Sequence, residues 1–178
     1  MVLYHVTTET KGNCIIRDGA IKINSPSSFK EEKTEKGFIY LSNRISIGYD
    51  IVKRTVSDND NYMYIFKICI PEKELLPDFD EAKIKKCISS DAIGILNECF
   101  STRVDFDINL KKYNVEFTKL PSIWNKTLFL ERFPNTSCEI FDEIKCLLSN
   151  LHNKFNKEIK EIEENEKKFE ENLKWEKC

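Results

Sequence analysis

The sequence predicts an α+β domain followed by a long amphipathic helix. Short segments of β-branched and aromatic residues alternate with segments of helical periodicity, and YMYIFKICI at 62–70 is apolar on both faces, which favours a central strand. In the tail, apolar residues recur about every 3.6 residues from Ile144 to Leu173, the period of a straight helix rather than of a left-handed coiled coil. We therefore expect a folded domain at 1–135 and a helix at 136–178.

Length and charge narrow the class of protein. The chain has 178 residues, which suits one hydrophobic core. Its formal net charge of −2 resides in residues 157–178, which hold six lysines and eight glutamates, so the net charge decides neither for nor against a nucleic-acid partner. There is no signal-peptide pattern, and no apolar run approaches the roughly 18 residues of a membrane span. We expect a cytoplasmic protein without a membrane partner.

Metal and disulfide chemistry are not expected. The seven cysteines form no C-x-x-C pair, which argues against a zinc site and against a secreted disulfide framework. Two histidines, His5 and His152, cannot supply a histidine-rich metal site. The sequence also lacks the H-E-x-x-H, G-x-S-x-G, P-loop and G-x-G-x-x-G motifs, so the common hydrolase, kinase and Rossmann classes are excluded.

Short apolar runs, and the turn and capping residues that bound them, predict the elements at the start of the chain. VLYHVTT at 2–8 is typical of a strand, and the residues up to Asp18 predict a helix that Gly19 can end in a left-handed cap. A short strand at 20–23 follows. The polar stretch 24–37 predicts a mobile surface loop that borders a site, because it has few apolar anchors.

The later elements follow the same logic. FIYLS at 38–42 predicts a strand, and Ser42 or Asn43 can cap a helix that continues through Arg54. A helix at 89–100 and strands at 103–106, 113–119 and 127–133 are expected further along.

Three polar residues stand at the edges of predicted strands: His5 in LYHVTT, Tyr40 in GFIYLS and Glu116 in YNVEFTKLP. Taken singly, each has an ordinary structural explanation, namely a histidine satisfied by a backbone carbonyl, a core tyrosine and an exposed strand glutamate. Their order and strand context together indicate a shared function.

The chain resembles the ADP-ribosyltransferase superfamily of the His-Tyr-Glu type, which includes diphtheria-toxin-like and poly-ADP-ribose-polymerase-like enzymes. The segments that carry the resemblance are YHVTTETKGNCIIRDGAIKI, GFIYLSNRISIGYD, YMYIFKICIPEKELLPD and NVEFTKLPSIWN. They cover residues 2–125 and leave out the tail. The resemblance implies a split β-sheet core with flanking helices and NAD as the cofactor. It also implies that the protein is a bacterial or phage effector, or toxin, that acts as a mono-ADP-ribosyltransferase.

The resemblance also implies roles for individual residues. His5 would bond the ribose hydroxyls of NAD, and Glu116 would bond the ribose 2-hydroxyl and stabilise the positive charge that grows on the sugar as nicotinamide leaves. Tyr40 or Tyr49 would stack on the nicotinamide ring. The implied catalytic residues are Glu116, His5 and Tyr40, and the implied cofactor-binding residues are His5, Val6, Thr7, Tyr40, Ser42 and Tyr49. We expect His5, Tyr40 and Glu116 to converge on one cleft.

The sequence does not identify the group that would accept ADP-ribose. Asn114 lies two positions before Glu116, so the Gln-x-Glu or Glu-x-Glu signature of arginine-modifying members is absent. A protein side chain, a nucleic acid and a small molecule remain alternatives, with a macromolecule preferred. A second hypothesis is a catalytically weak or inactive binding module that acts through the C-terminal helix, which could also serve self-association or a protein partner.

Overall fold

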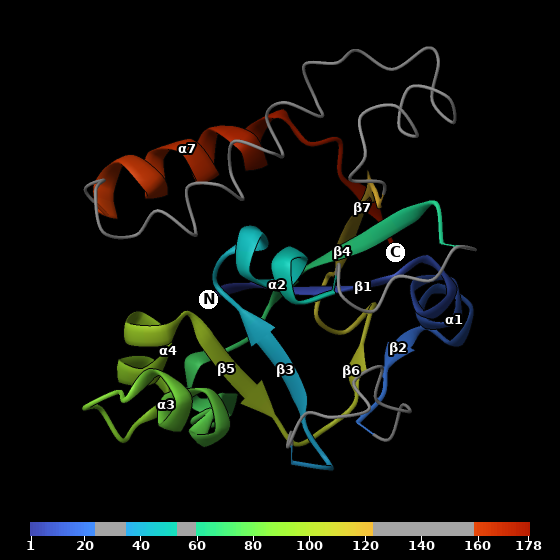
Figure 1. Ribbon diagram of the computed structural model, residues 1–178. Coiled ribbons are helices and arrows are strands. Elements are labelled where there is room, and N and C mark those ends of the chain that lie inside the picture. The colour runs from blue at the N-terminus through green and yellow to red at the C-terminus, as the bar shows by residue number, and fades with distance from the viewer. Residues whose placement is uncertain (24–34, 53–59, 123–158) are drawn as a thin grey trace.

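The computed structural model describes residues 1–23, 35–52, 60–122 and 159–178, which form an α+β fold around a mostly antiparallel sheet (Figure 1). The main sheet has the order β5-β3-β1-β4-β7-β8, with β1 (Val2–Thr8), β3 (Ile39–Ser42), β4 (Tyr62–Cys69), β5 (Ser101–Val104), β7 (Glu116–Pro121) and β8 (Glu176–Lys177). A separate pair consists of β2 (Ala20–Ile21) and β6 (Ile108–Asn109). The helices are α1 (Glu9–Asp18), α2 (Ile45–Val52), α3 (Phe79–Lys85), α4 (Ala92–Cys99) and α7 (Ile159–Asn172), with a 3-10 turn, η1 (Glu72–Glu74).

The predicted central strand is confirmed. Every residue of β1 pairs with β4, from Val2 opposite Cys69 to Thr8 opposite Met63, and β4 pairs along its other edge with β7. The run in β4 from Met63 to Phe66 is buried, as expected for a strand covered on both faces.

The sheet opens between β1 and β3. Within the described residues these two strands pair at one position, Tyr4 opposite Ser42, whereas β3 pairs along its whole length with β5. In Figure 1, β3 consequently runs away from β1 at a steep angle instead of lying along it. The main sheet is therefore divided into a β5-β3 part and a β1-β4-β7-β8 part.

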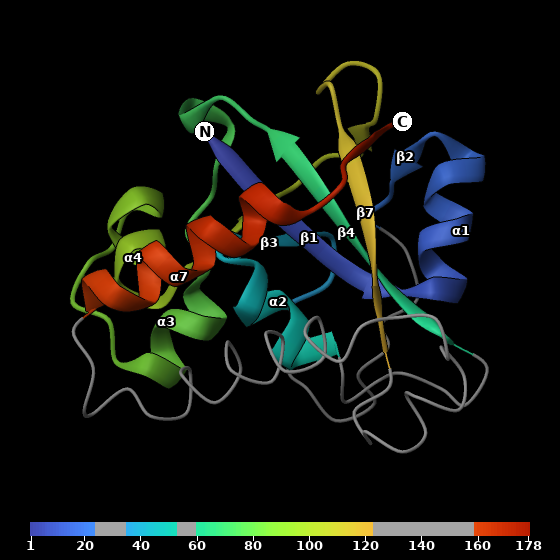
Figure 2. The same cartoon turned by 90° about the horizontal axis from the view of Figure 1, so that it is seen from above.

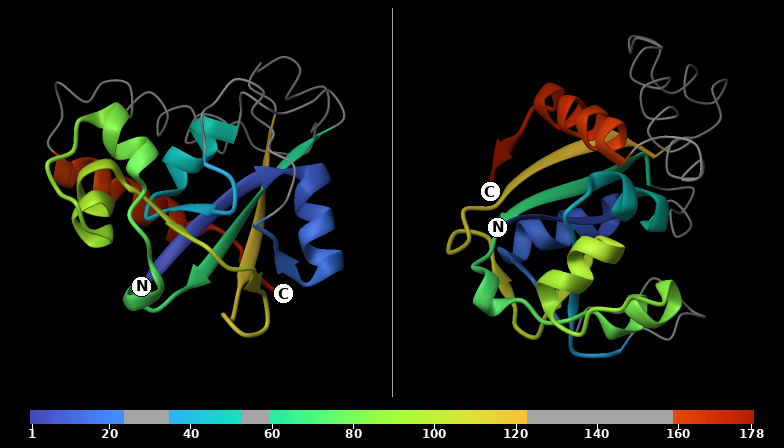
Figure 3. Two further views of the ribbon diagram at one scale, coloured as in Figure 1. Left: turned by 90° about the horizontal axis from the view of Figure 1, so that it is seen from below. Right: turned by 90° about the vertical axis from the view of Figure 1, so that its left-hand side faces the viewer.

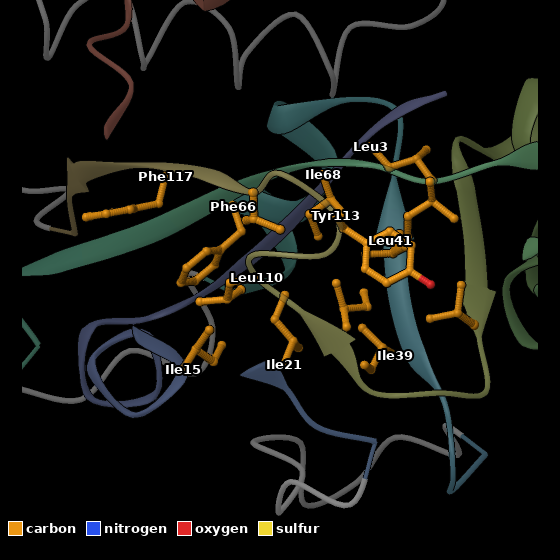
Figure 4. Packing of buried hydrophobic residues seen from close by; sticks show 14 of the residues in the cluster. Leu3, Ile15, Ile21, Ile39, Leu41, Phe66, Ile68, Leu110, Tyr113 and Phe117 are labelled. Atoms are coloured by element: carbon orange, nitrogen blue, oxygen red, sulfur yellow. The ribbon is translucent and has the colours of Figure 1, made fainter. Parts of the chain in front are cut away.

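Helices cover both faces of the central strands, and two glycines permit the close approach. A Cβ on Gly12 of α1 would lie 2.3 Å from Tyr64 Cγ, and a Cβ on Gly48 of α2 would lie 2.5 Å from Val6 Cγ2. Because such distances are far below van der Waals contact, glycine is required at both positions. Figure 4 shows the larger core cluster on the α1 side, where Phe66 and Phe117 lie above Ile15 and Ile21.

The C-terminal helix is part of the core. Phe169 is buried in the second apolar cluster with residues of β1, α2 and β4, and Leu173 and Trp175 pack against the same cluster. Trp175 stacks on Tyr4 with ring centroids 6.3 Å apart, and Lys67 Nζ lies 2.7 Å from Glu170 Oε1. Figures 1 and 3 show α7 over the sheet on the side opposite β2 and β6. The amphipathic face is thus used within its own chain.

A buried carboxylate ties α7 to the start of α2. Glu166 Oε1 accepts hydrogen bonds from the backbone N–H and the hydroxyl of Ser46, both at 2.9 Å. Burial raises the pKa of Glu166, and the two bonds from Ser46 oppose that rise. Glu166 therefore supplies a capping acceptor to the first turn of α2 from a residue 120 positions away.

Several helices and strands begin or end at other residues than the sequence predicts. The strand predicted at 113–119 starts only at Glu116, because Asn114 has a left-handed backbone with φ of 46° and places a turn before the strand. Helix α3 and the two-residue strands β6 and β8 were not expected, since segments this short carry little periodicity. The predicted strand 127–133, most of the predicted loop 24–37 and the predicted helical residues 144–158 lie outside the described residues.

Phe169→Ala should lower the free energy of unfolding by about 3 kcal/mol, because it removes a buried ring and leaves a cavity between α7 and the sheet. Lys168→Ala, on the exposed side of the same turn, should change it by less than about 0.5 kcal/mol. Urea unfolding monitored by circular dichroism compares the two variants with the parent. Equal stability of both variants would show that α7 does not contribute to the core.

Candidate functional site

His5 lies where β1 and β3 separate. Its Nδ1 is 3.2 Å from the carbonyl oxygen of Tyr40, so the imidazole occupies a position that a backbone N–H would take if the two strands continued to pair. The expected proximity of His5 to the Tyr40 strand is therefore present, through the Tyr40 backbone rather than its ring.

The environment of His5 fixes its proton arrangement. Burial lowers the pKa of His5, the bond to Tyr40 opposes this, and the nearby positive charge of Lys11 lowers it further. A neutral imidazole that bonds a carbonyl must carry its proton on Nδ1, which leaves a lone pair on Nε2. No described residue bonds Nε2. His5 consequently offers an acceptor for a hydroxyl or amide donor.

Tyr40 is held by a carboxylate. Its hydroxyl donates to Asp80 Oδ2 at 2.5 Å and accepts from the backbone N–H of Glu35 at 3.0 Å. Burial raises the pKa of Tyr40, and the hydrogen bond to the Asp80 carboxylate raises it further, so the phenol stays protonated at neutral pH. The contact fixes the orientation of the partly buried ring near the start of β3.

Arg103 is a site residue that the sequence did not reveal. It lies directly opposite Tyr40 in the β3–β5 pair, and its side chain is only 7% exposed. NH1 bonds Glu35 Oε2 at 2.8 Å, and the guanidinium stacks on the Phe38 ring at 3.9 Å. The buried Nε has no partner among the described residues. Only the β3–β5 pairing brings Arg103 to Tyr40, and no local pattern predicts that pairing.

The other expected cofactor-binding residues have structural partners. Val6 and Tyr49 are buried in the cluster beneath α2, and the Tyr49 hydroxyl donates to the Pro121 carbonyl at 2.8 Å. Ser42 donates to the Phe100 carbonyl at 2.6 Å. Thr7 is buried in β1. The two candidate tyrosines differ in burial: Tyr49 is 3% exposed, whereas Tyr40 is only partly buried.

The sheet register places Glu116 away from His5. His5 pairs with Phe66, which pairs with Phe117, so these three side chains share one face of the sheet. Glu116 pairs with Lys67 and is one position out of line with His5, so it points to the other face. The expected convergence of His5, Tyr40 and Glu116 on one cleft is therefore wrong for Glu116. Tyr40 alternates with Ile39 and Leu41, which belong to the same core cluster as Phe66, so the Tyr40 ring also lies on the face opposite His5.

The surroundings of Glu116 belong to the C-terminus. It is the first residue of β7 and pairs with Lys177 of β8. Burial and the neighbouring Glu116 carboxylate raise the pKa of the Cys178 thiol to about 11. The physical reason is that Phe117 and Val115 are drawn into the core, and the strand period of two then turns Glu116 outward.

Two absences apply to the described part of the chain. It contains no group of three or more His, Cys, Asp or Glu residues that could hold a metal ion. None of its helices combines the length and the hydropathy that crossing a membrane requires.

The comparisons with known proteins identify no family for this chain. No protein-family model matches the chain, and no curated protein matches it. Among solved structures, a chain named EcPltA aligns with a TM-score of 0.45 and 14% identity, over 71% of this chain and 78% of that chain. A similarity at this level carries no argument about function. The class defined by the structure is an α+β domain whose mostly antiparallel sheet opens at His5.

His5 should titrate with a pKa below the ordinary value of 6.5. Because the folded state then binds a proton less readily than the unfolded chain, the free energy of unfolding should be at its full value above pH 6.5 and fall below it. In a His152→Gln background, His5 is the only histidine, and its imidazole can be titrated by nuclear magnetic resonance.

His5→Asn is the matched control, because the Asn amide can still donate to the Tyr40 carbonyl but does not titrate. Urea unfolding at pH about 7.5 and about 5.5 should show a smaller loss of stability in this variant than in its parent. A His5 pKa at or above 6.5 would contradict the assigned proton arrangement.

Proposed function

We propose that the protein is an NAD-dependent mono-ADP-ribosyltransferase that modifies a macromolecule. The observation that supports this most is the neutral His5 at the opening between β1 and β3, with Nδ1 fixed by Tyr40 and Nε2 left as an acceptor. An oriented acceptor of this kind fits a sugar hydroxyl, which is the role that the resemblance implies for His5.

Tyr40, whose carbonyl bonds His5, and Arg103, which pairs with Tyr40, carry groups that suit a flat, partly polar ligand. Tyr40 is held in one orientation by Asp80, and the buried Nε–H of Arg103 has no partner among the described residues. A buried donor left unpaired costs about 1–3 kcal/mol, so an oxygen of a ligand would relieve that cost. NAD offers an aromatic ring for Tyr40 and hydroxyl, carboxamide and phosphate groups for the polar atoms.

The reaction would break the bond between nicotinamide and ribose and form a bond from the same sugar carbon to the acceptor. Nicotinamide leaves with the bonding electrons, and the acceptor loses a proton. A fixed carboxylate stabilises the positive charge that develops on the sugar. The resemblance implies Glu116 for this role, but the register places Glu116 on the face opposite His5, so Glu116 cannot act on a sugar that His5 binds. Asp80 is the described carboxylate that bonds the Tyr40 hydroxyl, and the Glu35 carboxylate bonds Arg103.

The alternative, a binding module acting through the C-terminal helix, has less support. The apolar residues Phe169, Leu173 and Trp175 pack against the protein's own sheet. The described part of α7 therefore has its apolar side committed to the core, and the observation favours a structural role for this helix.

His5→Asn should weaken NAD binding about tenfold, because a neutral hydrogen bond contributes roughly 0.5–1.5 kcal/mol and the Nε2 acceptor is lost. Glu116→Gln should leave NAD affinity unchanged and stability within about 0.5 kcal/mol, since its partly exposed side chain lies on the other face. Calorimetry with NAD measures both. The absence of NAD binding by the parent protein would refute the proposed function.

The rate of nicotinamide release then tests the carboxylate. Glu116→Gln should leave the rate unchanged, because Glu116 lies on the face opposite His5; a fall on the order of a hundredfold at unchanged NAD affinity would contradict this placement. An unchanged rate would remove Glu116 from the mechanism and direct the search to Asp80, which bonds the Tyr40 hydroxyl, and to the Glu35 carboxylate on Arg103. Mass spectrometry of cell extract incubated with labelled NAD identifies the acceptor.

A further inference from the structure

Two cysteine thiols meet between α3 and α4. Cys87 follows the C-terminal end of α3, and Cys99 is the last residue of α4. Both belong to a small apolar cluster with Ala82 and Ile95, and the Cys99 sulfur is in hydrogen-bond contact with the Cys87 thiol. Figures 1 and 2 show α3 and α4 side by side, on the opposite side of the molecule from α1.

The backbone directs Cys87 towards α4. Lys86 has a left-handed conformation with φ of 55°, and the N–H of Cys87 donates to the Ala82 carbonyl at 2.9 Å, which ends α3. The carboxylate of Glu98, in α4, accepts hydrogen bonds from the N–H groups of the next two residues, at 2.7 and 3.0 Å. Backbone contacts on both sides therefore hold Cys87 beside Cys99.

The two thiols differ in their access to solvent. Cys99 is 4% exposed, whereas Cys87 is partly exposed. The pKa of the Cys99 thiol is raised to about 12, chiefly by burial and also by the neighbouring Cys87. Cys99 therefore stays protonated at neutral pH, and Cys87 is the sulfur that a small oxidant reaches first.

We propose that Cys87 and Cys99 form an oxidation site, at which hydrogen peroxide converts the two thiols into a disulfide. The Cys87 sulfur attacks one oxygen of the peroxide, the O–O bond breaks, and the Cys87 proton leaves in a molecule of water. The Cys99 sulfur then attacks the Cys87 sulfur, the S–O bond breaks, and the Cys99 proton leaves in a second molecule of water. Two electrons pass from the two sulfurs to the peroxide, and no further reactant is needed.

Contact between the two sulfurs favours the second step. A thiol with a raised pKa is a poor nucleophile in a reaction between separate molecules. Here the Cys99 sulfur already lies against its target, so the step is intramolecular and has a high effective concentration. A metal site is not favoured, because the described part of the chain has no group of three or more residues that could hold an ion.

This inference is independent of the proposed enzymatic function. The sequence-based argument against disulfides concerned secreted frameworks and C-x-x-C spacing, whereas Cys87 and Cys99 meet only because α3 packs on α4. The disulfide would join the end of α4 to the end of α3, the helix whose Asp80 holds the Tyr40 hydroxyl. Oxidation would therefore restrain the helix that supports Tyr40.

The test is treatment of the full chain with hydrogen peroxide, followed by alkylation of the remaining thiols, digestion with trypsin and mass spectrometry. Because residues 87–102 contain no lysine or arginine, trypsin releases both cysteines in one peptide, residues 87–103. The parent should give this peptide without alkyl groups and two hydrogen atoms lighter than its reduced form. Reductant added before alkylation should restore both alkyl groups.

Three variants supply the controls. Cys69→Ser removes a cysteine exposed at the end of β4 and should form the disulfide as the parent does. In Cys99→Ser, Cys87 should stop at the sulfenic acid, which dimedone traps. In Cys87→Ser, Cys99 should react with peroxide about tenfold more slowly than Cys87 does in Cys99→Ser, because it is buried and protonated. Circular dichroism checks the fold, and Cys87→Ser, at a partly exposed position, keeps the test valid if Cys99→Ser unfolds.

Three results would overturn the proposal. The first is a fully alkylated 87–103 peptide from the peroxide-treated parent. The second is a disulfide from Cys87 or Cys99 to any other cysteine, including one in a second chain, which a non-reducing gel shows as a dimer. The third is loss of the disulfide in Cys69→Ser, which would show that the exposed Cys69 takes part.

Discussion

The pairing of β1 with β4 is the constraint on which the rest of the structure depends. β1 is paired with β4 along its whole length but with β3 at one described position, so β3 and β5 diverge and His5 fills the point of separation. Both faces of the β1–β4 unit are then covered, by α1 on one side and by α2 and α7 on the other. The same strand, β1, therefore forms part of the core along β4 and borders the opening towards β3.

Carboxylates distant in sequence complete the ends of the helices packed on this unit. Asp60 Oδ1 accepts from the N–H and the hydroxyl of Thr10, both at 2.8 Å, in the first turn of α1. Glu166 does the same for Ser46 in α2. In both cases the acceptor belongs to another element, so helix capping and tertiary packing are formed by the same contacts and should be lost together.

The candidate site combines what local sequence can and cannot indicate. The strand contexts predict His5 and Tyr40 as site residues, and the structure brings the His5 ring to the backbone carbonyl of Tyr40. Glu116 was found in the same way, but its face depends on which residue of β7 opposes Lys67. The alternation of a strand does not determine which set of side chains faces the core. In β7, Phe117 lies in the core, so Glu116 faces the other way.

The sequence by itself determined the α+β class, the first strand and helix, the left-handed Gly19, the central strand β4 and the amphipathic character of the tail, because these follow from local periodicity and backbone preference. The tertiary structure decided that α7 packs on its own sheet, that Arg103 lies opposite Tyr40 and that Glu116 faces away from His5. Those outcomes depend on strand pairing between residues far apart in the chain, and the free energy of such pairing comes from packing that no local window contains.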